Sequence, residues 1–254
     1  MPNLPFHIDI AINLATKPHS SIGKVLLPKL VFGSTCPDIK AIIKYTRKQT
    51  HFSELNVEYV GQGVEHLFKQ HPNLPQQAKN NLNLKSFLIG YISHIIADEI
   101  WITEIYLKTF KNNDTNNENK MKMNIMDRAI QLDMDQKIFN QLKKNKIPQI
   151  LKNTHEQLEL PFLTNKDLYE WELWLSQFLT NPFSWDRLFF FVKRMYSKSA
   201  EEKKANEFVE NLLSNKKKLK VDLKKIIPDN KIRAYKNNVI KRTIEITERY
   251  LNAN

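Results

Sequence analysis

The sequence predicts an all-α protein, folded as a single compact multi-helix domain. Only 5 of its 254 residues are glycine, whereas Leu, Ile, Lys, Glu and Gln are abundant. β-Sandwiches and α/β folds use more glycine in turns and phosphate loops, and this sequence has no glycine-rich nucleotide loop. No internal repeat or compositional linker divides residues 1–254, so we expect one domain, long enough to bury a sizeable core.

In the first half, helices are expected to alternate with polar or proline-containing segments. Apolar residues recur at helical spacing in four stretches, and these predicted helices are 7–17, 52–70, 84–110 and 120–144. The segment 18–38 and a polar stretch with Pro72 and Pro75 are expected to separate the first three. Residues 111–119, which are rich in Asn, cannot bury apolar surface and are expected to form a solvated loop.

In the second half, short capping or proline patterns mark where helices are expected to begin. These predicted starts are Thr164–Asp167, Asn181–Pro182, Ser199–Glu202 and Asp229. The first precedes an aromatic helix that contains Trp171 and Trp174. The last begins a helix that is expected to end near Leu251.

The chain is strongly basic, with a net charge of +12 that lies mostly in its last quarter. From Lys193 to Asn254 there are 17 Lys or Arg residues and 8 Asp or Glu residues. Such a charge favours an anionic partner, such as nucleic acid, a lipid headgroup or phosphate. The alternative is that these side chains only coat solvated helix faces.

The sequence predicts a soluble, cytoplasmic protein. Its single cysteine, Cys36, excludes an intramolecular disulfide framework. The first residues, Met1–Pro5, lack the basic and apolar segments of a signal peptide. The apolar run 87–102 is too short, and too interrupted by polar residues, to span a bilayer as a transmembrane helix.

The most informative stretch is the apolar run 87–101, which carries His94 and Asp98 four residues apart. In a helix this spacing places both side chains on one face. A helix that is apolar on nearly all sides is normally buried, and a buried carboxylate is costly unless it is paired or bound to a metal. Two interpretations follow: a His–Asp hydrogen bond in the core, or two ligands of a zinc ion.

The order of other polar residues extends this pattern along the chain. The pieces, in order, are His7, Gly33-Ser-Thr-Cys-Pro-Asp38, Thr50-His51-Phe52 and Phe87-Leu-Ile-Gly-Tyr-Ile-Ser-His94-Ile-Ile-Ala-Asp98-Glu-Ile-Trp101. This order resembles the zinc-dependent phospholipase C family, in particular a bacterial branch of uncharacterised proteins. The resemblance covers residues 1–135 well and is weaker at 126–129 and 181–187. It implies the all-α fold that S1/P1-type nucleases share.

The resemblance also implies a set of metal ligands. It assigns Asp38, His51, His94 and Asp98 to one zinc ion, and His7 with a bridging Asp98 to a second. It further implies that Asp38, a candidate base, and Asp98 are the catalytic residues. Residues 1–135 would form the metal-site half of the domain, and 136–254 a helical, basic part.

The third metal site of the trinuclear relatives is expected to be missing or rebuilt. Those enzymes use an N-terminal Trp, together with a second His-x-x-x-Glu and a further His. This chain begins Met1-Pro2, and its only histidine after Asp98 is His155. One or two zinc ions are therefore expected. The carboxylates that are candidates for a rebuilt site are Glu99, Glu104 and Asp127.

The function implied by the resemblance is hydrolysis of a phosphoester by a metal-activated water, as in a phospholipase C. The substrate would be a lipid headgroup or another phosphate-containing small molecule. Two alternatives stay open. One is a single-strand nuclease of the S1/P1 type, for which the basic last quarter offers a phosphate-binding surface. The other is a metal-stabilised helical domain that binds a partner without turnover.

Overall fold

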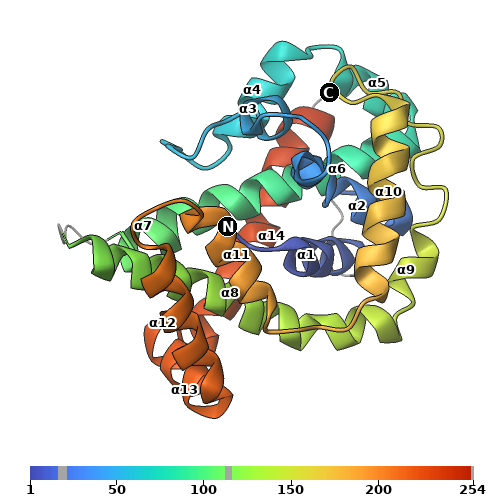
Figure 1. Ribbon diagram of the computed structural model, residues 1–254. Helices are drawn as coiled ribbons and strands as arrows, with labels where there is room; N and C mark the ends of the chain where they lie inside the picture. Colours follow the sequence, from blue (N-terminus) through green and yellow to red (C-terminus); the bar gives the residue numbers. More distant parts are fainter. Residues whose placement is uncertain (17–21, 112–115, 253–254) are drawn as a thin grey trace.

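The computed structural model describes residues 1–16, 22–111 and 116–252, and within these ranges it contains helices and no strand. The predicted all-α fold is confirmed, and the helices pack into one compact body (Figure 1). The helices up to residue 100 are α1 (Leu4–Thr16), α2 (Leu27–Gly33), the 3-10 helix η1 (Cys36–Ala41), α3 (Arg47–His51), α4 (Gln62–Gln70), α5 (Leu74–Asn80) and α6 (Leu82–Ile100). Those that follow are the π-helix η2 (Trp101–Tyr106), α7 (Leu107–Thr109), α8 (Asn117–Lys144), α9 (Ile147–Ile150), α10 (Asn165–Thr180), α11 (Arg187–Tyr196), α12 (Glu202–Ser214), α13 (Lys216–Ile226), α14 (Asp229–Thr247) and the π-helix η3 (Glu248–Asn252).

Helix α6 is the central element of the fold (Figure 1). Every residue from Ser86 to Ile100 is buried, as expected for a helix that is apolar on nearly all sides. Helices α1, α2 and α14 pack around it. The predicted helix 84–110 is confirmed, because η2 and α7 continue α6 to Thr109. Among the described residues, no helix combines the length and apolar character needed to cross a bilayer.

Helices α2 and α6 cross at two glycines. A Cβ atom added at Gly90 would lie 2.0 Å from the carbonyl oxygen of Leu30, and one added at Gly33 would lie 2.0 Å from that of Phe87. No side chain fits at such a distance, so the two main chains touch directly. This contact places Ser34, which follows α2, against the face of α6 that carries the polar residues.

Proline lies in the first turn of several short helices that the sequence analysis does not predict, among them α2, η1 and α5. Pro28, Pro37 and Pro75 lie in the first turns of α2, η1 and α5. A proline in the first turn lacks an N–H that would have no intrahelical partner there, and its fixed φ suits a helix. These prolines therefore start helices in segments where the sequence suggests connections.

The predicted helix 52–70 is wrong over its first part. Helix α3 ends at His51, because Phe52 adopts a left-handed conformation with a φ of 56°. Helix α4 begins only at Gln62, after an irregular segment. Leu55 and Tyr59, which contribute to the helical pattern in the sequence, are exposed in that segment.

The predicted helix starts in the second half have mixed outcomes. The capping box of Thr164–Asp167 is present at the start of α10. Asn181, by contrast, is the C-cap of α10, and the next helix begins at Arg187. Ser199 does not cap α12, because its hydroxyl accepts a hydrogen bond from the N–H two residues later instead of three. That helix begins at Glu202 without a side-chain cap.

The remaining predictions concern the two long helices and the loop. The helix predicted over 120–144 is confirmed as α8, and the last helix as α14, which η3 continues to Asn252. Helix α8 begins at Asn117, inside the predicted loop 111–119; residues 112–115 of that loop lie outside the described ranges. Helices α12 and α13, which carry many of the basic residues, project from the body of the molecule (Figure 1).

Candidate metal centre

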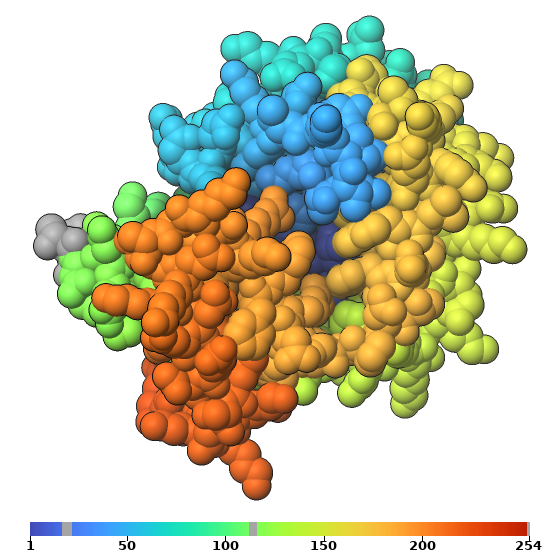
Figure 2. Space-filling view, in the orientation of Figure 1, coloured from blue at the N-terminus to red at the C-terminus, as the bar shows by residue number. Residues whose placement is uncertain are grey.

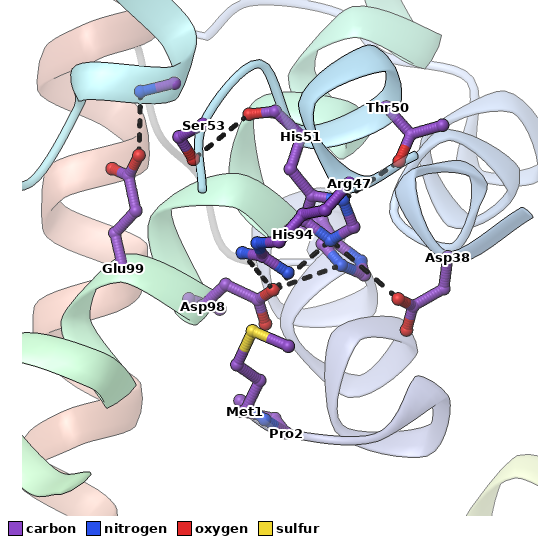
Figure 3. Close-up of polar contacts among 12 residues, drawn as sticks. Met1, Pro2, Asp38, Arg47, Thr50, His51, Ser53, His94, Asp98 and Glu99 are labelled. Carbon is purple, nitrogen blue, oxygen red and sulfur yellow. Dashed lines mark hydrogen bonds and ion pairs between the residues drawn. The ribbon is translucent and has the colours of Figure 1, made fainter. Parts of the chain in front are cut away.

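Three short stretches of chain meet α6 at a buried polar cluster (Figure 3). His7 comes from α1, Asp38 from η1 and His51 from the end of α3, and α6 contributes His94 and Asp98. The three histidines are fully buried and the side chain of Asp98 is 1% exposed, whereas that of Asp38 is 28% exposed. The structure thus brings together all five residues that the sequence analysis proposes as ligands.

Asp98 lies between the histidines. Its Oδ1 atom is 3.6 Å from Nε2 of His7, and its Oδ2 atom is 3.3 Å from Nε2 of His51 and 3.8 Å from Nε2 of His94. The Oδ1 atom of Asp38 lies 3.8 Å from Nε2 of His51. The two oxygens of Asp98 therefore face different histidines, which is the arrangement that a bridging carboxylate needs.

Two groups of three ligand atoms result. One consists of His7, His94 and Asp98, and the other of Asp38, His51 and His94; in each group the ligand atoms lie within 4.8 Å of one another. Imidazole nitrogens and carboxylate oxygens are the ligand types that zinc accepts. His94 belongs to both groups, but its Nδ1 atom is used by Ser34, so its one remaining nitrogen could bind a single ion.

Hydrogen bonds orient two of the imidazoles. Nδ1 of His94 lies 2.7 Å from the carbonyl oxygen of Ser34, to which it donates, so that Nε2 is left as the acceptor atom. Nδ1 of His51 lies 3.0 Å from the hydroxyl of Thr50. The ring of His7 stacks on that of His94, with a centroid distance of 3.7 Å.

The histidines are held in the neutral form. Burial lowers the pKa of His7 to about 3 and that of His94 to about 4. It also places the pKa of His51 well below the ordinary value, with a further contribution from the charge of Arg47. A neutral imidazole is the form that binds a metal ion.

Several atoms of the cluster have no hydrogen-bond partner among the described residues. They are buried, and they are Nδ1 of His7, Nε2 of His51, Nε2 of His94 and Oδ1 of Asp98. A His–Asp pair with a purely structural role would satisfy such atoms, because an unpaired buried polar atom costs about 1–3 kcal/mol. Unpaired nitrogen and oxygen atoms gathered in one buried cluster instead fit a bound cation. The donor set and its geometry therefore fit zinc.

Arg47 is a member of the cluster that the sequence analysis misses. Its Nη2 atom donates to Oδ2 of Asp98 over 3.1 Å, and its side chain is 7% exposed. Its Nε and Nη1 atoms are buried and have no partner among the described residues. Arg47 precedes His51 by four residues, the spacing at which two side chains share a helix face, and this was the signal in the sequence.

The charge of Arg47 affects the carboxylates. Burial alone would raise the pKa of Asp98, but His51, His94 and Arg47 outweigh it and hold that pKa well below its ordinary value. Asp98 is therefore ionised. Burial and the negative charge of Asp98 raise the pKa of Asp38.

The comparison with protein families agrees with this geometry. A family model described as zinc dependent phospholipase C matches residues 6–213. The chain belongs to the zinc-dependent phospholipase C family. The match includes all five clustered residues and extends well beyond residue 135. No curated protein and no solved structure shows a significant match to the chain.

The three carboxylates considered for a third zinc site of this family have other partners. Glu99 accepts hydrogen bonds from the N–H groups of Gly61 and Gly63 at the start of α4. Glu104 accepts hydrogen bonds from Asn238, on α14. Asp127 accepts hydrogen bonds from the side chains of Trp101 and Gln131. None of the three belongs to the two ligand groups found among the described residues.

The first residues of the chain also lie at the centre. Met1 and Pro2 are placed beside Asp98 (Figure 3), and the carbonyl oxygen of Pro2 lies 3.3 Å from Nε2 of His7. The backbone between Asn3 and His7 turns directly into α1.

A cavity of about 520 Å³ opens beside Asp38. In Figure 2 a hollow lies between α10, α11 and the segment around η1, with residues from the start of the chain at its floor. Aromatic side chains of α10 and α11 and several basic side chains line the cavity. Of the five clustered residues, only Asp38 is among its lining residues, so the cavity approaches the metal centre from the side of Asp38.

Proposed function

We propose that this protein is a zinc-dependent hydrolase of a phosphoester, similar to a phospholipase C. The observation that carries the proposal is the convergence of unpaired, buried His and Asp atoms at the end of a cavity. When bound, zinc activates a water molecule and neutralises the negative charge that develops at phosphorus. Family membership supports the reaction class.

The residues of the chain would have distinct roles in this reaction. Asp98 stays ionised because His51, His94 and Arg47 hold its pKa well below the ordinary value. Its two oxygens face different histidines. His94 is oriented by Ser34. Asp38, with its side chain 28% exposed, reaches the cavity and can accept a proton from an attacking water.

We also propose that Arg47 contacts the substrate. Its Nε and Nη1 atoms are buried donors without a partner among the described residues. A guanidinium group binds a phosphoryl group through two parallel hydrogen bonds, which an ammonium group does not reproduce. Arg47 would supply fixed positive charge where the chain lacks the ligand pattern of a third zinc ion.

The test is hydrolysis by the zinc-supplied full chain. The substrates are bis-p-nitrophenyl phosphate, short-chain phospholipids and single-stranded DNA. We expect turnover of bis-p-nitrophenyl phosphate or of a phospholipid, and a loss of kcat of at least about 100-fold in Asp38→Asn and His94→Ala. The matched control is Asp9→Asn, because Asp9 lies on α1 near His7 but pairs with Lys236; its activity should stay close to that of the wild type.

Two outcomes would contradict the proposal. Turnover of DNA alone would favour the single-strand nuclease. Stoichiometric zinc without turnover of any of these substrates would favour the metal-stabilised binding domain.

A further inference from the structure

The charged residues that line the cavity beside Asp38 are mainly cations. They are Lys40, Arg187 and Arg194, and Asp38 is the single acid among the lining residues that the structure describes. The lining thus holds three basic side chains and one acidic side chain. The interior of the cavity therefore carries an excess of positive charge.

Two of these cations have no ion-pair partner within the described part of the chain. Lys40 and Arg194 form no hydrogen bond or ion pair among the residues that the structure describes, whereas Arg187 lies 3.8 Å from Asp135 and stacks on Phe178. Because Lys40 and Arg194 line one cavity, their positive charges face the same space, and an anion bound there would offset them.

The wall and the rim of the cavity are apolar, in contrast to its charged interior. Trp171, Trp174 and Phe178 on α10 form a continuous stack of rings along the cavity. Ile42 and Phe190, which also line it, are 40% and 65% exposed. Large apolar side chains beside unpaired cations fit a ligand with an anionic end and an apolar end.

We propose that the cavity selects phospholipids with a net-negative headgroup, with the headgroup near Lys40 and Arg194 and the acyl chains against the aromatic wall. The substrate assignment rests on the proposed phosphoesterase function. A choline headgroup would place a quaternary ammonium next to unpaired cations and would be disfavoured. A volume of about 520 Å³ lies within the range of small-molecule sites, so it holds a headgroup and the first part of the chains.

A lipid fits these features better than nucleic acid does. A strand requires a basic track that continues beyond one pocket, with cations spaced along its backbone phosphates. Here the exposed rim residues Ile42 and Phe190 are apolar, and the lysine-rich helix α13 contributes no residue to the cavity lining.

The test compares two dihexanoyl lipids that differ only in the headgroup, phosphatidylglycerol and phosphatidylcholine. Binding is measured by calorimetry on the zinc-supplied full chain, using analogues in which a C–P bond replaces the scissile ester, so that affinity is read without turnover. We expect roughly tenfold tighter binding of the glycerol analogue at low salt, with a preference that falls as salt is added. The double variant Lys40→Ala/Arg194→Ala should lose that preference.

The matched control is Lys44→Ala/Lys193→Ala. These two exposed lysines lie close to Lys40 and Arg194 in the sequence and are not among the residues that line the cavity. This control removes the same charge from the same two segments of the chain, and it should keep the preference.

The outcomes separate this inference from the proposed function. Preference without hydrolysis of the natural ester would support the cavity assignment and contradict the phosphoesterase. Hydrolysis with equal binding of both headgroups, or equal losses in both double variants, would overturn the cavity assignment and leave the phosphoesterase intact. Single-stranded DNA that binds through Lys40 and Arg194, while neither lipid binds, would also overturn it.

Discussion

Within the described part of the chain, histidines meet a carboxylate at the metal centre and again at Glu172, and the two clusters differ in their hydrogen bonding. At the metal centre, Asp98 and three histidines converge, and several of their atoms lack partners among the described residues. In the middle of α10, Glu172 also lies against a histidine, with 2.9 Å between its Oε2 atom and Nδ1 of His155. The residue types are similar, so composition does not distinguish the two clusters, although His155 is 19% exposed and the histidines of the metal centre are fully buried.

Hydrogen bonding does distinguish them. Both carboxylate oxygens of Glu172 are occupied: they accept from the N–H groups of Asn153 and His155, the hydroxyl of Thr154 and the ring of His155. Burial opposes ionisation of Glu172, but these donors lower its pKa nonetheless. These hydrogen bonds connect the segment after α9 to α10, and both oxygens of Glu172 have donors without a metal ion. A carboxylate whose oxygens all have hydrogen-bond donors indicates a structural role. Unpaired buried atoms gathered in one cluster indicate a bound ligand.

The buried acid Asp135 has neither the full set of donors that Glu172 has nor the histidines that surround Asp98. Asp135 accepts one hydrogen bond from Asn3 through Oδ2, and its Oδ1 atom has no partner among the described residues. Burial raises its pKa to about 7, although Arg187 and Asn3 act in the opposite direction. With too few donors and no histidine beside it, this carboxyl group tends to take up a proton instead.

The largest expected effect is on zinc content. Asp98→Ala removes the carboxylate that faces all three histidines, so purified protein should fall from at least one zinc equivalent to almost none. Glu172→Gln should retain the metal. Elemental analysis of both variants checks this, and loss of zinc in the Glu172 variant alone would reverse the roles assigned to the two clusters.

Removal of zinc from the wild type should be the next largest effect. A chelator leaves the unpaired atoms of the centre without a ligand, and we expect the free energy of unfolding to fall by several kcal/mol. Denaturant unfolding with and without chelator measures this loss. An unchanged midpoint would show that the metal contributes no stability.

Asp135→Asn should change how stability depends on pH. The carboxyl group has a higher pKa in the folded protein than in the unfolded chain, so the folded state holds a proton that the unfolded chain releases above about pH 4. The contribution of this carboxyl group to the free energy of unfolding therefore declines as pH rises from about 4 to about 7 and is constant above that. In the variant this decline should be absent; it totals a few kcal/mol, at about 1.4 kcal/mol per pH unit. Parallel pH profiles for variant and wild type would contradict the assignment.

Glu172→Gln should have the smallest effect, a destabilisation of about 1–3 kcal/mol. The amide keeps the shape of the side chain but replaces one acceptor oxygen with a donor that faces other donors. Because the cluster is separate from the metal centre, the same loss should appear in zinc-loaded and zinc-free protein. A loss that appears only in the zinc-loaded protein would mean that the two clusters are coupled.

The elements that the sequence predicts well are those with local signals. The apolar run of α6 and the spacing of His94 and Asp98 define both the helix and the face it presents. The resemblance to a known family then adds His7, Asp38 and His51, which no local pattern would have joined. In the sequence, the prolines of α2, η1 and α5 are interpreted as marks of connecting segments. Proline can also begin a helix, and each of these does.

Other features depend on contacts between residues distant in the sequence. Lys40 and Arg194 become neighbours only because η1 and α11 face the same cavity. The sequence suggested Glu99, Glu104 and Asp127 as metal ligands, and each accepts at least one hydrogen bond from another element of the fold. Saturation of a carboxylate by donors depends on the complete fold, so the sequence could not separate Glu172 from Asp98.

The crossing of α2 and α6 at Gly33 and Gly90 has a consequence for redesign of this protein. The hydrogen bond from His94 to Ser34 spans the same crossing, where main chain meets main chain. Libraries that repack the surrounding Ile, Leu and Phe residues can therefore change core volume without altering the spacing that orients His94. Even a methyl group at either glycine would force the helices apart, so a screen for zinc retention should recover glycine at both positions while it tolerates wide variation around them.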